Sequence, residues 1–228
     1  MQLFSAPSPQ AEISPADFAG RWYFCDDGWL GTLTLALTDG PALTGTFASE
    51  RFGEEYRVTA RAAELPHAIE LVIHDYNWLP EQRYAGRLMT RSRSAIAGSS
   101  LWQDTPFGFF ATRASYPLGR YRPGVARGED FVGSWTAYLD GELATVVLSF
   151  DPDSGTLHGS CTVGSDRFEV AGRPGGTVPH EVALTVRTGT DGEVAYLSGY
   201  LMSRPKNAVS GVLTVAGTRL GFIMIRYA

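Results

Sequence analysis

Short stretches in which apolar and polar residues alternate occur throughout the chain. In one stretch Ile69, Leu71 and Ile73 are apolar, and Glu70 and Val72 lie between them. A period of two places successive side chains on opposite faces, as in a β-strand with one buried face. Turn signals separate the stretches, among them Asp39-Gly40-Pro41, Asp153-Ser154-Gly155 and Asp191-Gly192. The pattern predicts eight short strands in each half of the chain.

The two halves repeat each other at a constant offset of 113 residues. Gly20-Arg21-Trp22 recurs as Gly133-Ser134-Trp135, and Pro66-His67 recurs as Pro179-His180. Eight sequential strands that close on themselves form an up-and-down barrel, which leaves no sheet edge unpaired. We therefore predict an all-β fold of two tandem eight-stranded antiparallel up-and-down β-barrels.

The repeat also sets the expected domain boundaries. We expect an N-terminal extension at residues 1–17, a first barrel at 18–114, a linker at 115–128 and a second barrel at 129–228. His67 and His180 are the one equivalent pair of histidines, and because each follows a proline at the end of a strand, a turn role is predicted for both. The duplication further suggests that the two barrels pack as a pseudo-dimer.

Several short motifs resemble the avidin and lipocalin barrels of the calycin superfamily. They are Gly20-x-Trp22, Leu43-Thr44-Gly45-Thr46-Phe47, Tyr84-Ala85-Gly86 and the closing Gly108-Phe109-Phe110-Ala111-Thr112-Arg113. The resemblance implies that the first-strand tryptophan plugs one end of each barrel and that an arginine of the last strand packs on its ring, which would pair Trp22 with Arg113 and Trp135 with Arg226. The resemblance does not extend to biotin binding. The positions at which avidin has polar groups that contact biotin are occupied here by Phe24, Phe47 and a residue at or near Thr112.

Alternation, checked between the two copies, assigns one face of each strand to the lumen. The expected lumen of the second barrel is apolar throughout. In the first barrel the half near the Trp22 plug is also apolar, but eight other positions are polar or aromatic: Asp26, Ser49, Tyr56, Asp75, Gln82, Tyr84, Ser100 and Trp102. Because strands alternate in direction, all eight fall at the mouth opposite the plug. Strand ends near loops are wetter in any barrel, yet the second barrel carries apolar residues at the equivalent positions, such as Leu139, Ala195, Leu213 and Val215.

An apolar floor below a few convergent polar groups is typical of a small-molecule site. The predicted ligand-binding residues are Phe24, Phe47, Ser49, Tyr56, Gln82, Tyr84, Ser100 and Trp102. Asp26 and Asp75 are candidate catalytic residues, because burial beside aromatic rings would raise the pKa of at least one carboxyl group and create an acid and base pair. Solvated or turn-capping carboxylates are the alternative interpretation.

Composition and charge narrow the classes of function. The 228 residues include 26 Gly and 13 Pro, and the net charge of −5 comes without the clustered Lys and Arg that a nucleic-acid partner requires. The first residues carry no basic and apolar signal segment, so we expect no membrane association and a cytoplasmic location. The two cysteines, Cys25 and Cys161, are not equivalent in the repeat and are expected to be reduced. Four histidines and two cysteines show no metal-ligand spacing, and no phosphate-binding or dinucleotide motif occurs, so neither a metal nor a cofactor is predicted.

Three functions fit the sequence. The first is binding of a small, largely apolar or amphipathic molecule in the lumen of the first barrel. The second is a cofactor-free cyclase or isomerase of bacterial secondary metabolism, in which the lumen folds a flexible apolar substrate and Asp26 or Asp75 supplies acid or base catalysis. The third is a structural or interaction protein without a ligand, and self-association through the barrel exteriors is compatible with all three.

Overall fold

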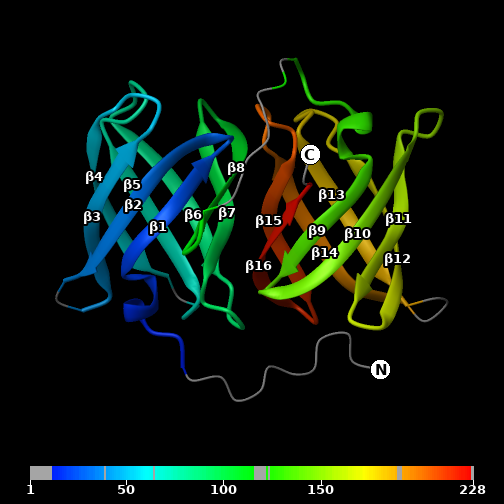
Figure 1. Cartoon of the computed structure of the whole chain (residues 1–228), viewed down its shortest axis with the longest axis horizontal. Helices are drawn as coiled ribbons and strands as arrows, with labels where there is room; N and C mark the ends of the chain where they lie inside the picture. Colours follow the sequence, from blue (N-terminus) through cyan, green and yellow to red (C-terminus); the bar gives the residue numbers. More distant parts are fainter. Residues whose placement is uncertain are drawn as a thin grey trace.

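A computed structural model describes residues 12–38, 40–63, 65–115, 122, 124–188 and 192–226. It consists of two closed antiparallel barrels that lie side by side (Figure 1). The predicted fold class and tandem duplication are confirmed. The first eleven residues of the expected extension and residues 116–121 and 123 of the expected linker lie outside the described residues.

Each barrel has eight strands in sequential order, and its last strand pairs with its first. The first barrel contains β1 (Gly20–Asp26), β2 (Trp29–Leu37), β3 (Ala42–Ser49), β4 (Glu55–Ala62), β5 (Ala68–His74), β6 (Glu81–Leu88), β7 (Ala95–Trp102) and β8 (Thr105–Thr112). The second contains β9 (Gly133–Leu139), β10 (Glu142–Asp151), β11 (Thr156–Val163), β12 (Asp166–Pro174), β13 (Glu181–Arg187), β14 (Glu193–Leu201), β15 (Ala208–Val215) and β16 (Thr218–Ile225). A short 3-10 helix precedes each barrel, η1 (Pro15–Phe18) and η2 (Gly128–Phe131). Neither of these two helices, the only ones among the described residues, has the length or apolar character needed to cross a membrane.

A two-residue turn connects β1 to β2. Asp26 pairs with Trp29, and the two turn residues, Asp27 and Gly28, have φ values of 48° and 88°. Two successive residues in the left-handed region define a type I′ turn, whose twist matches that of the strands it joins. The turn fixes the directions of Asp26 and Asp27 at the open end of the barrel.

Each barrel is closed at the opposite end by a tryptophan. The indole Nε1 of Trp22 donates to the carbonyl of Phe18 at 2.8 Å, and the guanidinium carbon of Arg113 lies 3.5 Å from the Trp22 ring centroid. Trp135 and Arg226 repeat the stacking contact at 4.7 Å. Both implied Trp and Arg pairs are therefore present, and they seal one end of each barrel through cation–π contacts.

The two lumens are filled differently. Aliphatic side chains dominate the second lumen, whereas the upper part of the first is occupied by aromatic rings in contact. The ring centroid of Phe24 lies 5.3 Å from that of Phe47, 5.2 Å from that of Tyr84 and 5.4 Å from that of Phe109. These are direct packing distances, so the predicted aromatic walls form a solid core.

The barrels pack against each other through β6, β7 and β8 of the first and β14, β15 and β16 of the second. The contacts are duplicated at the sequence offset: Nε2 of His67 lies 2.8 Å from the carbonyl of Arg219, and Nε2 of His180 lies 2.8 Å from that of Pro106. Such reciprocity is the mark of a pseudo-twofold, isologous interface. The expected pseudo-dimer is present. Both histidines lie in turns, as predicted, and their side chains in addition form hydrogen bonds across the interface.

The interface has its own apolar core and a very close backbone approach. Buried residues of both barrels, including Cys25, Met89, Phe110, Met202 and Ile223, form one cluster between them. A Cβ atom on Gly108 would lie 2.7 Å from Oγ of Ser210 and 2.8 Å from the carbonyl of Tyr200. The equivalent Gly221 is similarly confined, with the carbonyl of Arg87 at 2.9 Å from such an atom.

We therefore expect Gly108→Val to force the barrels apart and destabilise the protein by about 1–3 kcal/mol, the range for overpacking of a filled core. Chemical denaturation of wild type and variant measures the difference. Gly176→Val is the matched control, because a Cβ atom there meets nothing within 4 Å. Equal losses in the two variants would contradict the close packing of the interface.

Candidate functional site

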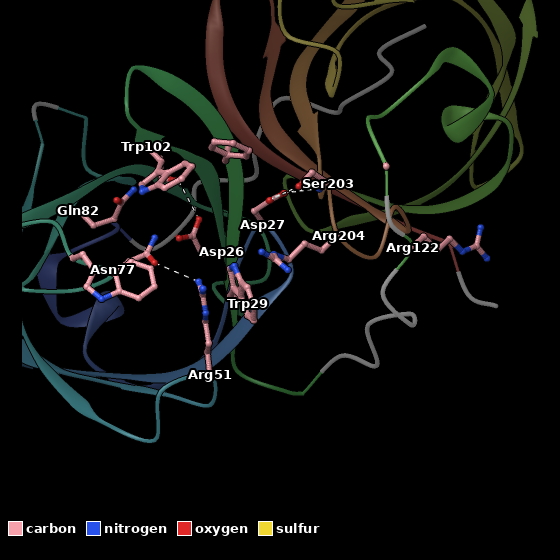
Figure 2. A pocket seen from close by; sticks show the side chains of 14 residues that line it. Asp26, Asp27, Trp29, Arg51, Asn77, Gln82, Trp102, Arg122, Ser203 and Arg204 are labelled. Atoms are coloured by element: carbon pink, nitrogen blue, oxygen red, sulfur yellow. Dashed lines mark hydrogen bonds between the residues drawn. The ribbon is translucent and has the colours of Figure 1, made fainter.

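A pocket of about 340 Å³ lies at the mouth of the first barrel, where the turn between β14 and β15 of the second barrel forms part of its wall (Figure 2). It is lined by Asp26, Asp27, Trp29, Arg51, Asn77, Trp78, Gln82, Ser100, Trp102, Phe107, Arg122, Gly124, Ser203 and Arg204.

Asp26, the last residue of β1, provides a carboxyl group at the inner side of this pocket. Its Oδ2 accepts a hydrogen bond from Oη of Tyr84 at 2.9 Å, and its Oδ1 accepts one from Oγ of Ser100 at 3.1 Å. Burial raises the pKa of Asp26 from 3.8 to about 7, although the two hydrogen bonds oppose the shift. Near neutral pH this carboxyl group can therefore give or accept a proton.

Asp27 lines the pocket and contacts the second barrel. Its two carboxylate oxygens accept hydrogen bonds from the backbone N–H and the hydroxyl of Ser203. Burial raises the pKa of Asp27 to about 6, against the lowering effect of the Ser203 hydrogen bonds and the Arg204 charge. Thr90 and Asp140 make the same pair of bonds at the equivalent place, so this contact belongs to the pseudo-twofold interface.

Trp29, the first residue of β2, lies between two guanidinium groups. The guanidinium carbon of Arg51 is 3.9 Å from the Trp29 ring centroid, and that of Arg204 is 3.7 Å from it. Two groups this close cannot share one face of the ring, so they cover opposite faces, as Figure 2 shows. The pocket thus contains two cations held over an aromatic surface.

The turn between β5 and β6 forms the outer rim. Asp75, Asn77 and Trp78 have φ values of 56°, 55° and 61°. Non-glycine residues rarely adopt this conformation, and a tryptophan does so least readily. Trp78 is 80% exposed, so a large aromatic surface stands at the edge of the pocket with little burial to stabilise it.

Gln82, which lines the pocket, has a buried acceptor that is not satisfied. Its Nε2 donates to the carbonyl of Leu101 at 2.8 Å, which fixes the orientation of the amide because only the nitrogen can donate. Its Oε1 is buried and has no hydrogen-bond partner, although the side chain is only 2% exposed. A buried acceptor without a partner costs about 1–3 kcal/mol, and a ligand with an N–H or O–H group would supply the missing bond.

The structure brings four of the predicted site residues together, namely Asp26, Gln82, Ser100 and Trp102. Phe24, Phe47 and Tyr84 lie beneath the pocket in the aromatic core, and Ser49 is buried beside Tyr76. Tyr56 packs on Phe47 and Tyr76 and donates to Oε2 of Glu54 at 2.8 Å. None of these five lines the pocket.

Asp75 does not face Asp26 across the mouth. The alternation of β5 predicts an inward side chain, but the strand ends at His74 and the backbone then enters the left-handed region. Asp75 is consequently exposed, and Tyr76, only 1% exposed, fills the inward position. Asp26 and Asp75 therefore do not form the predicted acid and base pair.

The sequence interpretation missed Trp29, Arg51, Trp78 and Arg204. The repeat contained a signal for Trp29 and Arg204. At the offset of 113 their positions correspond to Glu142 and Arg91, two oppositely charged residues, and in the structure Nη1 of Arg91 lies 3.0 Å from Oε2 of Glu142. Arg51 and Trp78 lie in turns, where alternation assigns no direction.

The equivalent mouth of the second barrel is apolar. Leu139, Ala195 and Leu213 stand where the first barrel has Asp26, Gln82 and Ser100, and all three are buried in the lumen cluster. The polar pocket is therefore a feature that the first copy alone carries. As for metals, no group of three His, Cys, Asp or Glu side chains within the described ranges could hold a metal ion.

Comparisons with known proteins identify no family. No protein-family model matches the chain, and no curated protein matches it. Among solved structures, the chain is similar to a crystal structure of a protein of unknown function from the DUF3598 family of Nostoc punctiforme. The match has 12% sequence identity and a TM-score of 0.33, and it covers 95% of this chain and 98% of the other.

The raised pKa of Asp26 predicts a pH dependence of stability. Between pH 4 and 7 the folded protein binds a proton that the unfolded chain lacks, so stability is higher below this window and falls as pH rises through 7. One pKa unit corresponds to about 1.4 kcal/mol, so we expect wild type to lose ~2 kcal/mol between pH 5 and 8 that Asp26→Asn retains. Chemical denaturation at both pH values measures this loss. The exposed Asp75→Asn serves as control, and an Asp26→Asn profile identical to wild type would contradict the prediction.

Proposed function

We propose that this protein binds a small amphipathic molecule in the pocket at the mouth of the first barrel. The observation that carries the proposal is the buried, unpartnered Oε1 of Gln82, a residue that lines the pocket together with a partly protonated carboxyl group. Folded proteins rarely leave such an acceptor unsatisfied, and a binding site is a common reason for an exception.

The composition of the pocket walls supports this function. Trp78, Trp102 and Phe107 supply apolar surface, whereas Asp26, Gln82 and Ser100 supply a small number of oriented polar atoms. This combination is characteristic of ligand sites, in which desolvation of apolar surface gives affinity and a few hydrogen bonds fix orientation.

Because side chains fill the lumen of the first barrel, the proposed ligand site lies at the mouth and not inside the barrel. Phe24, Phe47, Tyr84 and Phe109 are in ring-to-ring contact, so the space that a wholly apolar guest would need is filled. The rings serve instead as a rigid base that holds Asp26 in place through Tyr84. An amphipathic molecule suits this position better than a purely apolar one.

We also infer that the two barrels are related to the calycin barrels. The cation–π pairs at the closed ends and the preceding 3-10 helices support this relation. In a calycin-like barrel the open mouth is the natural entrance for a ligand, which agrees with the location of the pocket.

A cofactor-free isomerase or cyclase is the second candidate. A carboxyl group with a pKa of about 7 is well matched to proton transfer at neutral pH. Asp26 would deliver or remove the proton, and the pocket would restrict a flexible substrate to its reactive conformation.

Replacing three pocket residues by their counterparts in the second barrel should abolish ligand binding. In a triple variant, Asp26→Leu, Gln82→Ala and Ser100→Leu, each residue is replaced by its buried counterpart, Leu139, Ala195 and Leu213. We expect this variant to fold, because the second barrel accommodates the same residues, and to lose ligand signals in ligand-observed NMR of a small-molecule library. Circular dichroism checks the fold. Equal binding by both proteins would place the ligand elsewhere, and no binding by wild type would favour the structural role.

Asp26→Asn separates a binding protein from an enzyme. The amide keeps the size of the side chain but cannot exchange a proton, so binding of library hits should persist while any isomerisation falls by about 10²–10⁴-fold. Chromatography with mass detection, after incubation of each hit with the protein, reports products of unchanged mass. If wild type converts no hit, the binding function stands and the catalytic candidate is wrong.

A further inference from the structure

Arg51 is a cation in the pocket that has no carboxylate partner among the described residues. Its guanidinium stacks on Trp29, Phe52 and Trp78, and Nη1 donates to Oδ1 of Asn77 at a long 3.3 Å. A guanidinium has five N–H donors. Most of this donor capacity is therefore available to a molecule in the pocket, although the side chain is half-buried.

A second cation lies across the same ring. Arg204, from the turn between β14 and β15, covers the other face of Trp29, so two positive charges flank one indole. The nearby carboxyl groups compensate only partly: Asp26, with a pKa of about 7, is about half protonated near neutral pH, and the charge of Asp27 acts on Arg204, whereas Arg51 has no carboxylate partner among the described residues. The outer part of the pocket consequently favours an anion.

The inner part favours a hydrogen-bond donor. Oε1 of Gln82 lacks a partner, and Oδ1 and Oδ2 of Asp26 each already accept one bond. Because both faces of Trp29 are covered by guanidinium groups, a flat ligand would stack on the partly exposed Trp102 instead. Trp102 is 37% exposed, which leaves room for such a contact.

We propose that the pocket selects small planar organic acids, with the carboxylate bound by Arg51 beside Arg204 and an N–H or O–H group donated to Oε1 of Gln82. This inference rests on the proposed binding function and adds the chemical class of the ligand. It also makes the second barrel a part of the site, because Arg204 comes from it.

Three indole probes of matched shape test the charge. Indole-3-acetate carries a carboxylate, indole-3-acetamide is neutral and tryptamine is a cation, and all three have a flat ring with one N–H donor. We expect the wild-type protein to bind the acetate roughly tenfold more tightly than the amide, the size expected for a charge-assisted hydrogen bond in a partly buried site. Tryptamine should bind most weakly. Isothermal titration calorimetry or ligand-observed NMR gives the three dissociation constants.

Substitutions at Arg51 identify the group that recognises the anion. Arg51→Gln should reduce the preference for acetate over amide to about one, whereas Arg51→Lys should keep a preference because it keeps the charge. Arg57→Gln is the control, since Arg57 is an exposed arginine of the same barrel outside the pocket. Thermal unfolding of each variant shows whether the fold is intact.

A methylated probe tests the inner end. 1-Methylindole-3-acetate lacks the N–H donor and should bind several-fold more weakly than indole-3-acetate, because Oε1 of Gln82 then stays unsatisfied. In Gln82→Met, which lacks the acceptor, the two acetates should bind equally.

The outcomes distinguish this inference from the proposed function. Equal affinity for acetate and amide, or a preference that survives Arg51→Gln, overturns the selection of acids while leaving the binding function standing. Absence of binding by all the probes also overturns the proposed ligand class, and the library screen then decides whether the pocket binds anything else.

Discussion

The pseudo-twofold contact between the barrels is the constraint on which the pocket depends. At Gly108 and Gly221 the two backbones approach so closely that a single methyl group would collide with the other barrel. This approach brings the turn between β14 and β15 against the mouth of the first barrel, where Ser203 binds Asp27 and Arg204 covers Trp29. The first barrel alone would lack this wall, so both barrels are needed to form the pocket.

The duplication explains how one interface position could acquire a new property. In one copy Arg91 pairs with Glu142, and in the other Arg204 stacks on Trp29 at the equivalent position. Both contacts hold an arginine at the interface, one through an ion pair and the other through a cation–π contact. The exchange of Glu142 for Trp29 between the copies therefore keeps the arginine at the interface, while Arg51, Asp26, Gln82 and Ser100 are present in the first copy only.

The sequence predicted those features that depend on periodicity. Alternation and the constant offset identified the barrels and the polar mouth containing Asp26, Gln82 and Ser100, and the resemblance to calycin barrels implied the Trp and Arg pairs. Alternation failed where a strand ended, which is why Asp75 is exposed and Tyr76 faces inward. Alternation also predicts the direction of a side chain but not whether neighbouring side chains fill the lumen. Phe24 and Phe47 were therefore expected to line a cavity, whereas they fill it. The interface role of His67 and His180 could not be read from the pattern, because it depends on how one barrel is oriented relative to the other.

Asp26 and Arg51 are not paired with each other, and this has a cost. Asp26 is held by hydroxyl groups, Asp27 by Ser203, and Arg51 by aromatic faces. A direct ion pair between Arg51 and Asp26 would lower the pKa of the carboxyl group and satisfy the guanidinium in one step. The aromatic contacts instead fix Arg51 over Trp29, and the buried carboxyl group, with a pKa of about 7, stays about half protonated near neutral pH. A fold selected for stability alone would fill this mouth as the second barrel does, with leucine and alanine. Unpaired polar groups on a rigid aromatic base fit the proposed binding function, in which a ligand completes their bonds.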